Sequence, residues 1–153
     1  MPHACIGVDV IVGFPGETEE DFLESYNFIK DLDISYLHVF TYSERPNTLA
    51  DEMEGIVPVE ERRRRNEMLR ILSEKKKRAF YSQFLGHRRD VLFEVHKDSN
   101  FMTGFTDNYL KIETAIDPSK LNQIATVQLM NINDNGNLDV IVMDIPENAF
   151  GFV

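Results

Sequence analysis

The hydrophobic pattern of the first 42 residues predicts a strand, a helix and a second strand. Residues 6–12 form a nearly continuous apolar run rich in Val and Ile, which favours a parallel strand covered on both faces. Thr18 can cap the helix that follows, and three acidic residues in its first turn match the positive end of the helix dipole. The apolar positions of this helix recur at spacings of four and three: Phe22, Tyr26 and Ile29. With a second strand over residues 36–42, the segment is a βαβ unit.

A long helix is predicted over residues 58–85, about 42 Å in length. Pro58 suits the first turn of a helix, and Gly86 suits the position just past its end. One side of this helix carries Leu69, Leu72, Ala79, Phe80 and Gln83. The opposite side carries basic residues every seven positions, at Arg63, Arg70 and Lys77, with Glu67 and Glu74 within ion-pairing reach.

From Arg88 onward the hydrophobic period changes from that of a helix to that of a strand. Five short strands are expected, starting near Arg88 and covering residues 101–105, 109–114, 124–132 and 138–143. Asn135-Gly136 predicts a hairpin turn with positive φ at both central residues. Five strands in about 60 residues favour a small antiparallel β-barrel.

The expected fold is therefore an α/β part followed by an all-β part. Its predicted divisions are residues 1–57, a linking basic helix over 58–86, a barrel over 87–146 and a tail over 147–153. A two-stranded parallel sheet leaves most of its apolar surface uncovered. Further strands are therefore expected upstream, or else a second copy pairs with this one, and the exposed sheet edge could self-associate.

Composition and charge narrow the class of protein. The chain has 153 residues, 42% of them hydrophobic, with one cysteine, which excludes an internal disulfide framework and fits a cytoplasmic protein without membrane spans. Residues 1–57 carry a net charge of −10, residues 58–90 carry +6 and residues 91–153 carry −6. Only the middle segment has the sign that attracts a phosphate backbone. The four histidines are dispersed and form no metal-binding pattern.

Two loops leave the predicted strands at the edge where α/β proteins bind ligands. The first is Gly13-Phe14-Pro15-Gly16-Glu17, whose glycines allow close approach and whose acidic neighbours disfavour a phosphate. The second contains Tyr42, Ser43 and Arg45, and its guanidinium could clamp a carboxylate or phosphate. Both loops could equally be structural: a strand-to-helix turn and a polar surface loop.

These two loops resemble motifs of the radical S-adenosylmethionine (SAM) methylthiotransferases. The resemblance rests on Gly-Phe-Pro-Gly-Glu-Thr, a Phe-x-Tyr-Ser strand end and Arg-Pro-Asn-Thr, where the family usually has Gly in place of Asn47. It implies the last two strands of a radical-SAM barrel. The implied SAM environment comprises Gly13, Phe14, Pro15, Gly16, Glu17, His38, Tyr42, Ser43 and Arg45. Two segments, 37–40 and 80–86, resemble most the branch that acts on threonylcarbamoyladenosine in tRNA, next to the anticodon.

The last segment resembles a TRAM domain, the small RNA-binding barrel that ends these enzymes. Residues 104–109 match its Gly-x-Thr-x-Asn-Tyr signature. Phe101, Phe105 and Tyr109 could stack on RNA bases or fill the barrel core, and we favour the core for any one of them. The runs Arg62–Arg65 and Lys75–Arg78 could contact tRNA or form a solvated face. The predicted RNA-binding residues are Arg63, Arg70, Lys77, Arg88, Arg89, Phe105, Asn108 and Tyr109.

The resemblance implies two 4Fe-4S clusters and SAM in the complete enzyme. One cysteine cannot hold a cluster, so this chain is expected to be a carboxyl-terminal part that lacks the cluster-binding portion. On that interpretation it binds no stable cluster, contains no catalytic or metal-ligating residue, and is inactive by itself. The alternatives are a freestanding RNA-binding or interaction module and, less favoured, a methylthiotransferase that acts on a ribosomal protein.

Overall fold

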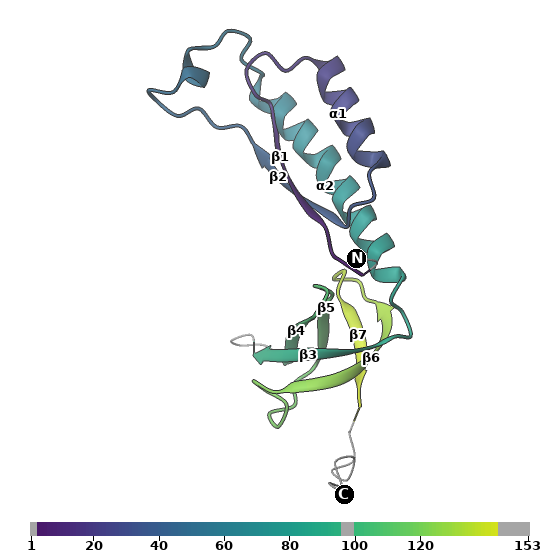
Figure 1. Cartoon of the computed structure of the whole chain (residues 1–153). Coiled ribbons are helices and arrows are strands. Elements are labelled where there is room, and N and C mark those ends of the chain that lie inside the picture. Colours follow the sequence, from purple (N-terminus) through teal and green to yellow (C-terminus); the bar gives the residue numbers. More distant parts are fainter. Residues whose placement is uncertain (1–2, 96–99, 144–153) are drawn as a thin grey trace, which may run out of the picture. The chain divides into compact units, whose positions relative to one another are not determined.

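The computed structural model describes residues 3–95 and 100–143 and divides into two compact units (Figure 1). One unit is Ile6–Ala79, and the other joins Met1–Cys5 to Phe80–Val153. The predicted tail over 147–153 lies outside the described residues. The helix that begins at Val59 starts in the first unit and ends in the second.

The first unit is a βαβ motif followed by a second helix. Its elements are β1 (Gly7–Val12), α1 (Glu19–Asp31), β2 (Tyr36–Thr41), the short 3-10 helix η1 (Leu49–Glu52) and most of α2 (Val59–Ser82). β1 and β2 pair in parallel from Gly7↔Tyr36 to Val12↔Thr41, as the hydrophobic pattern predicts. Both helices pack on one face of this sheet (Figure 1). The buried core consists of Val12, Phe22, Ile29, Leu37, Leu69 and Leu72.

The predicted start of α1 is confirmed by a capping box. The Thr18 hydroxyl accepts a hydrogen bond from the Asp21 amide at 3.1 Å, and the Asp21 carboxylate accepts one from the Thr18 amide at 2.9 Å. Each bond satisfies an amide that the first turn of a helix leaves without an intrahelical partner. This local chemistry fixes where the chain turns from the glycine-rich loop into the helix.

The apolar stripe expected on α2 is present only in part. Leu69, Leu72 and Phe80 are buried, whereas Ala79 and Gln83 are exposed. Leu69 and Leu72 belong to the core of the first unit, while Phe80 belongs to the core of the second. The spacing of apolar residues predicted the position of the helix correctly. The prediction of one continuous apolar stripe was wrong, because one stretch of α2 packs in the core of the first unit and another in the core of the second.

Side chains of helix α2 bond backbone groups at one edge of the sheet. The Ser73 hydroxyl accepts from the Leu37 amide at 2.8 Å and donates to the Leu37 carbonyl at 3.0 Å. About two turns earlier, the Asn66 side-chain amide donates to the Val39 carbonyl at 3.3 Å. These side chains replace the strand that would otherwise be needed to satisfy the edge of β2.

The second unit is a closed five-stranded barrel in the order β3-β4-β5-β7-β6. Its strands are β3 (Arg88–Val95), β4 (Phe101–Thr106), β5 (Lys111–Ala115), β6 (Ile124–Ile132) and β7 (Leu138–Val142). The number of strands is as predicted, but the prediction of an antiparallel barrel is wrong, because β5 and β7 pair in parallel. The core gathers Phe80, Tyr81, Phe84, Val91, Phe93, Met102, Leu110, Ile112, Val127, Leu129 and Leu138.

The hairpin between β6 and β7 forms where predicted, with a different turn. Gly136 has φ +72°, but Asn135 is not among the residues with positive φ. The Gly136 amide instead donates to the Asn133 carbonyl at 3.0 Å, and the Asn133 amide donates to the Asn137 carbonyl at 2.9 Å. This arrangement is typical of a longer loop in which one left-handed residue follows a tight turn.

Candidate ligand site and nucleic-acid interface

The turn after β1 is held open by two glycines and one glutamate. Gly13 and Gly16 adopt φ +80° and +87°, a region that residues with a Cβ rarely enter. The Glu17 carboxylate accepts a hydrogen bond from the Gly13 amide at 2.9 Å, closing the turn on itself. The Gly16 amide donates to the Gly55 carbonyl at 2.8 Å, so the turn is also joined to the loop that follows β2.

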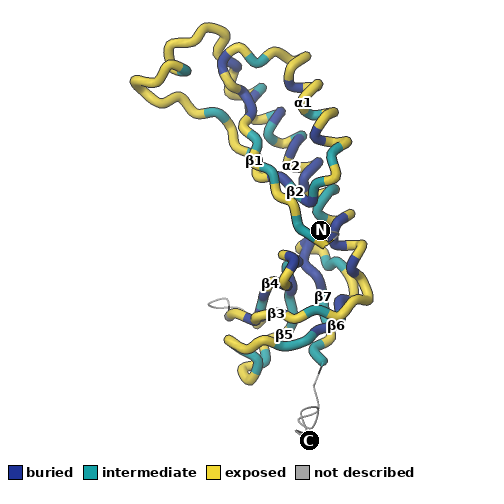
Figure 2. The backbone as a smooth tube through the Cα atoms, in the orientation of Figure 1, coloured by how far each residue is buried: buried dark blue, intermediate teal, exposed yellow. Residues whose placement is uncertain are grey.

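A cavity of about 710 Å³ lies at this end of the sheet. Four of the nine residues predicted for the SAM environment line it: Phe14, Tyr42, Ser43 and Arg45. The other lining residues are Ile11, Phe40, Thr41, Thr48 and Ala50. Phe40 and Thr48 belong to the motifs quoted from the sequence, although neither was predicted to be a site residue. The lining does not include the other predicted residues of the turn that contains Phe14, which are Gly13, Pro15, Gly16 and Glu17. Figure 2 shows the loop after β2 exposed almost throughout.

The Tyr42 ring, at this cavity, contacts two other side chains. Its ring meets the Phe14 ring edge-on at 5.4 Å, and the Arg62 guanidinium lies 5.5 Å from its centroid. The Tyr42 hydroxyl is buried and has no hydrogen-bond partner among the described residues. A buried hydroxyl in that state is ready to bond a polar ligand atom. Asn47, in the same loop, has φ +67°. This left-handed conformation suits the Gly that the family usually has at this position, and Asn tolerates it as well.

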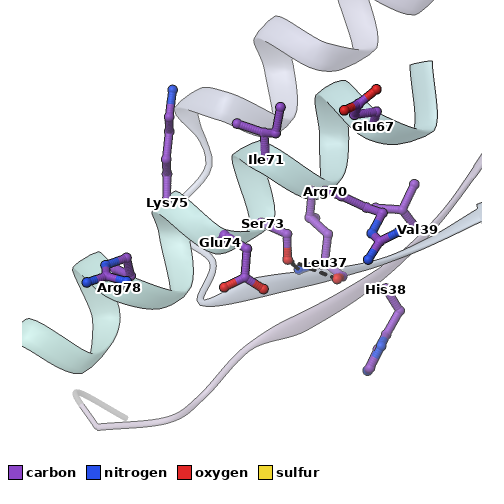
Figure 3. A pocket seen from close by; sticks show the side chains of 10 residues that line it. All are labelled: Leu37, His38, Val39, Glu67, Arg70, Ile71, Ser73, Glu74, Lys75 and Arg78. Carbon is purple, nitrogen blue, oxygen red and sulfur yellow. Dashed lines mark hydrogen bonds between the residues drawn. The ribbon is translucent and has the colours of Figure 1, made fainter. Parts of the chain in front are cut away.

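The face of the sheet opposite the helices carries polar and aromatic side chains. Asp9 lies in register with His38, and Ile11 with Phe40, all four of them exposed. The His38 ring meets the Tyr36 ring edge-on at 5.0 Å. Figure 3 shows His38 pointing away from α2, so this predicted site residue belongs to the open face and not to the cavity lined by Phe14. Asp9 was missed, although an acidic residue inside an apolar strand is itself a signal.

Two of the four arginines in the run Arg62–Arg65 are buried. Arg62 and Arg65 are only 3% and 4% exposed, and each forms ion pairs with glutamates of the first unit. The hydrogen bond from Arg62 lowers the pKa of Glu44, and that bond to Glu44 raises the pKa of Arg62. The predictions that this run contacts tRNA or forms a solvated face are therefore wrong for these two residues.

The remaining basic residues predicted on α2 are exposed to different degrees. Arg63 is exposed and bonds Glu60 at 2.9 Å, whereas Lys77 is a quarter exposed and lies 3.8 Å from Glu74. Arg70 lines a groove of about 740 Å³ between α2 and the edge of β2. Figure 3 shows its side chain directed toward Val39. Within the described parts of the chain, no ion pair to Arg70 is found.

The signature of residues 104–109 builds a turn between β4 and β5. A Cβ on Gly104 would lie 2.3 Å from the Leu92 carbonyl oxygen, so only glycine fits there. The Thr106 hydroxyl donates to Asn108 Oδ1 at 2.7 Å and accepts from the Leu110 amide at 2.9 Å. Asn108 is thereby buried, and its Nδ2 has no partner in the described structure. Tyr109 adopts φ +63° and is 66% exposed.

The aromatic residues for which we favoured the barrel core lie outside it. Phe101 and Phe105 are each 51% exposed, and the Phe105 and Tyr109 rings lie 6.0 Å apart. The register extends this surface across four strands, from β6 through β3 and β4 to β5. In strand order the row is Ile124, Leu92, Phe105 and Lys111. Leu92 and Ile124 were missed because outward apolar residues look like core residues in a sequence.

Arg88 and Arg89 are the first two residues of β3. Arg88 is exposed, whereas the Arg89 side chain is 14% exposed. Arg89 bonds Asp107 at 3.1 Å and the His3 ring at 2.9 Å, so its guanidinium is occupied by contacts within the second unit. Of the two, Arg88 is the one whose position leaves it open to a ligand.

Across residues 3–95 and 100–143, no group of three His, Cys, Asp or Glu side chains could hold a metal ion. The half-buried Cys5 packs against the barrel core. No helix in the described structure is long and apolar enough to span a bilayer.

Several known proteins are similar to this chain in sequence. No protein-family model matches the chain. It is 37% identical over 134 residues to the threonylcarbamoyladenosine tRNA methylthiotransferase MtaB of Bacillus subtilis, covering 85% of this chain and 30% of that protein. It is 40% identical over 112 residues to MtaB of Aquifex aeolicus, covering 73% and 26%. The tRNA-2-methylthio-N(6)-dimethylallyladenosine synthase of Endomicrobium trichonymphae is 41% identical over 98 residues, covering 64% and 23%.

The chain thus spans about 30% or less of the length of these relatives. The similarity to the Bacillus subtilis protein covers 85% of this chain, and the motifs quoted from the sequence lie in the glycine-rich turn and in residues 104–109. Together with the motifs at these two places, it shows that the chain belongs to the MiaB-like family of tRNA methylthiotransferases and is similar to its MtaB branch.

Proposed function

We propose that this chain is part of a radical-SAM enzyme that methylthiolates threonylcarbamoyladenosine next to the tRNA anticodon. The observation that carries the proposal is the similarity, over 85% of the chain, to MtaB of Bacillus subtilis, whose name states that substrate. The first unit then contributes to the SAM site, and the second unit binds tRNA.

The two edges of the β1–β2 sheet differ, and this difference supports the proposal that the sheet is part of a larger barrel. Ser73 and Asn66 bond backbone groups of Leu37 and Val39 at the outer edge of β2, whereas β1 pairs only with β2 among the described strands. A strand whose edge lacks partners is a site for adding another strand. Further strands of a barrel would therefore join at β1, and the face carrying Asp9 and His38 would become the interior.

The residues at the end of the sheet fit SAM but not an iron–sulfur cluster. Phe14 and Phe40 offer apolar surface to an adenosyl group, Tyr42 offers a hydroxyl, and the excess of carboxylates in the first unit suits a cation. When bound, SAM would supply the radical and the methyl group. Clusters need several thiolates, and the chain has one cysteine, so we propose that they are bound by another part of the enzyme and that this chain is inactive by itself.

The exposed aromatic surface of the barrel supports RNA binding. Bases stack on aromatic rings without requiring a positive surface, which suits a segment with a net charge of −6. Phe105 and Tyr109 provide neighbouring rings, Leu92 extends the surface, and Lys111 places a cation at its end.

A hybrid enzyme tests the catalytic assignment. This chain would replace the matching segment of Bacillus subtilis MtaB in a strain that lacks its own enzyme, and tRNA nucleosides would be measured by mass spectrometry. We expect methylthiolated threonylcarbamoyladenosine with the hybrid and none with this chain alone. A hybrid that folds and carries its clusters, yet leaves the tRNA unmodified, would contradict the proposal.

RNA binding is tested on the chain itself with a fluorescent anticodon stem-loop. Losing one stacked base costs about 1–3 kcal/mol, so Phe105→Ala or Tyr109→Ala should weaken binding by roughly 5- to 150-fold. Ile141→Ala is the matched control, since Ile141 is 52% exposed on β7 and outside the aromatic surface. Equal losses in all three variants would refute an RNA site at this surface.

A further inference from the structure

Arg65 reaches from α2 to the turn that follows β1. Its Nη1 donates to the Glu17 carboxylate at 2.6 Å and to the Glu17 backbone carbonyl at 3.1 Å. The other oxygen of the same carboxylate accepts from the Gly13 amide at 2.9 Å. One guanidinium, one carboxylate and one backbone amide thus form a continuous chain that fixes the turn at both ends.

Arg62 performs the corresponding task for the segment after β2. Its Nε donates to the Val57 carbonyl at 2.7 Å and its Nη1 to the Tyr42 carbonyl at 3.2 Å, while Nη2 pairs with Glu44. Its aliphatic stem fills the space beside Gly13, where an added Cβ would lie 2.4 Å from Arg62 Cγ. Arg62 therefore contacts both ligand-facing segments at once.

Arg62 and Arg65 are buried, so their ion pairs differ from ion pairs on a protein surface. The Arg62 and Arg65 side chains are 4% and 5% exposed, so each guanidinium needs its partners to compensate for lost hydration. An apolar side chain would serve packing equally well. Only a planar fork with several donors reaches carboxylates and backbone carbonyls together. The two arginines are one turn apart on α2, which explains how one helix holds two loops.

We propose that Arg62 and Arg65 are positioning residues that hold the two ligand-facing segments, 13–17 and 42–45, in binding geometry from behind the cavity. The two segments present Phe14, Tyr42 and Arg45, whose placement depends on backbone that the arginines fix. That the ligand is SAM rests on the proposed function, whereas the positioning role does not. From the sequence, this run could contact tRNA or form a solvated face, and neither interpretation predicts a positioning role.

Hydrogen–deuterium exchange of the full chain tests the positioning role. Arg65→Gln should speed exchange in residues 13–17 about tenfold or more and leave 42–45 unchanged, because of the two segments Arg65 bonds only the first. Arg62→Gln should speed exchange in both segments. Arg65→Lys, which keeps the charge but loses the fork, should restore protection only in part. Arg63→Gln is the matched control, since Arg63 lies between the two on α2 and its side chain is 70% exposed.

The pattern of exchange separates positioning from general stability. Uniformly faster exchange across residues 6–79, or no change in either segment, would overturn the proposal. In the hybrid enzyme, Arg65→Gln should raise the KM for SAM about tenfold with kcat within about twofold. Local exchange that changes while this KM does not would support the positioning role and refute the assignment of the segments to SAM.

Discussion

Replacing Glu113 on β5 should loosen the closure of the barrel. The β5–β7 pair that closes it has only two register pairs, Ile112↔Leu138 and Glu113↔Asp139. The Glu113 carboxylate adds three hydrogen bonds across this seam, because it accepts from the side-chain amides of Asn133, Asn135 and Asn137. Their lengths lie between 3.0 and 3.2 Å.

The expected loss follows from these contacts. A net contribution of about 0.5–1.5 kcal/mol for each bond bounds the total, and Gln retains one accepting oxygen, so Glu113→Gln should cost about 1–3 kcal/mol. For a unit of this size that shift lowers Tm by roughly 5–20 °C. Asn137 is buried, so its amide would be left without a partner and should account for much of the loss.

Calorimetry with residue-resolved NMR would assign the affected transition to the barrel. Glu94→Gln is the matched control, since it removes the same charge from an exposed position on β3. An unchanged Tm in Glu113→Gln, or an equal drop in both variants, would show that the carboxylate does not hold the seam.

Two further predictions concern single local features. Gly104→Ala should destabilise the barrel by about 1–3 kcal/mol, because its Cβ would lie 2.3 Å from the Leu92 carbonyl oxygen; an unchanged urea midpoint would contradict this. The side-chain hydrogen bond from Thr18 lowers the pKa of Asp21 below its ordinary value of 3.8. A lowered pKa stabilises the fold above that value, so α1 should lose stability as the pH falls below about 3.8, and an Asp21→Asn variant should lack this dependence in circular dichroism.

Local signals were sufficient for the elements of this fold. The apolar run before Gly13 predicts β1, the Thr18 cap predicts the start of α1, and Asn135-Gly136 predicts the hairpin between β6 and β7. Each depends on residues close together in sequence, so each can be recognised without knowing the fold. The type of turn at Asn135 escaped prediction because the neighbouring strands determine it.

The candidate sites were predicted less completely. Phe14, Tyr42, Ser43 and Arg45 line one cavity as expected, because the ends of parallel strands meet at one edge of a sheet. Asp9 escaped notice since an apolar strand was taken to be covered on both faces. The core interpretation of Phe105 was wrong, because an aromatic residue in a strand pattern shows no sign of which face is buried.

The sequence by itself determined which segments become helices and strands, which loops carry the family motifs and where the charge changes sign. Tertiary structure decided what those side chains do. Arg65 looks like any surface arginine of a basic helix, yet folding places it beside Glu17, which lies 48 positions earlier in the chain. Only the packing of α2 on β1 and β2 brings these groups together. Charge pairing across such a separation depends on three-dimensional distance, and a periodicity along one helix cannot encode it.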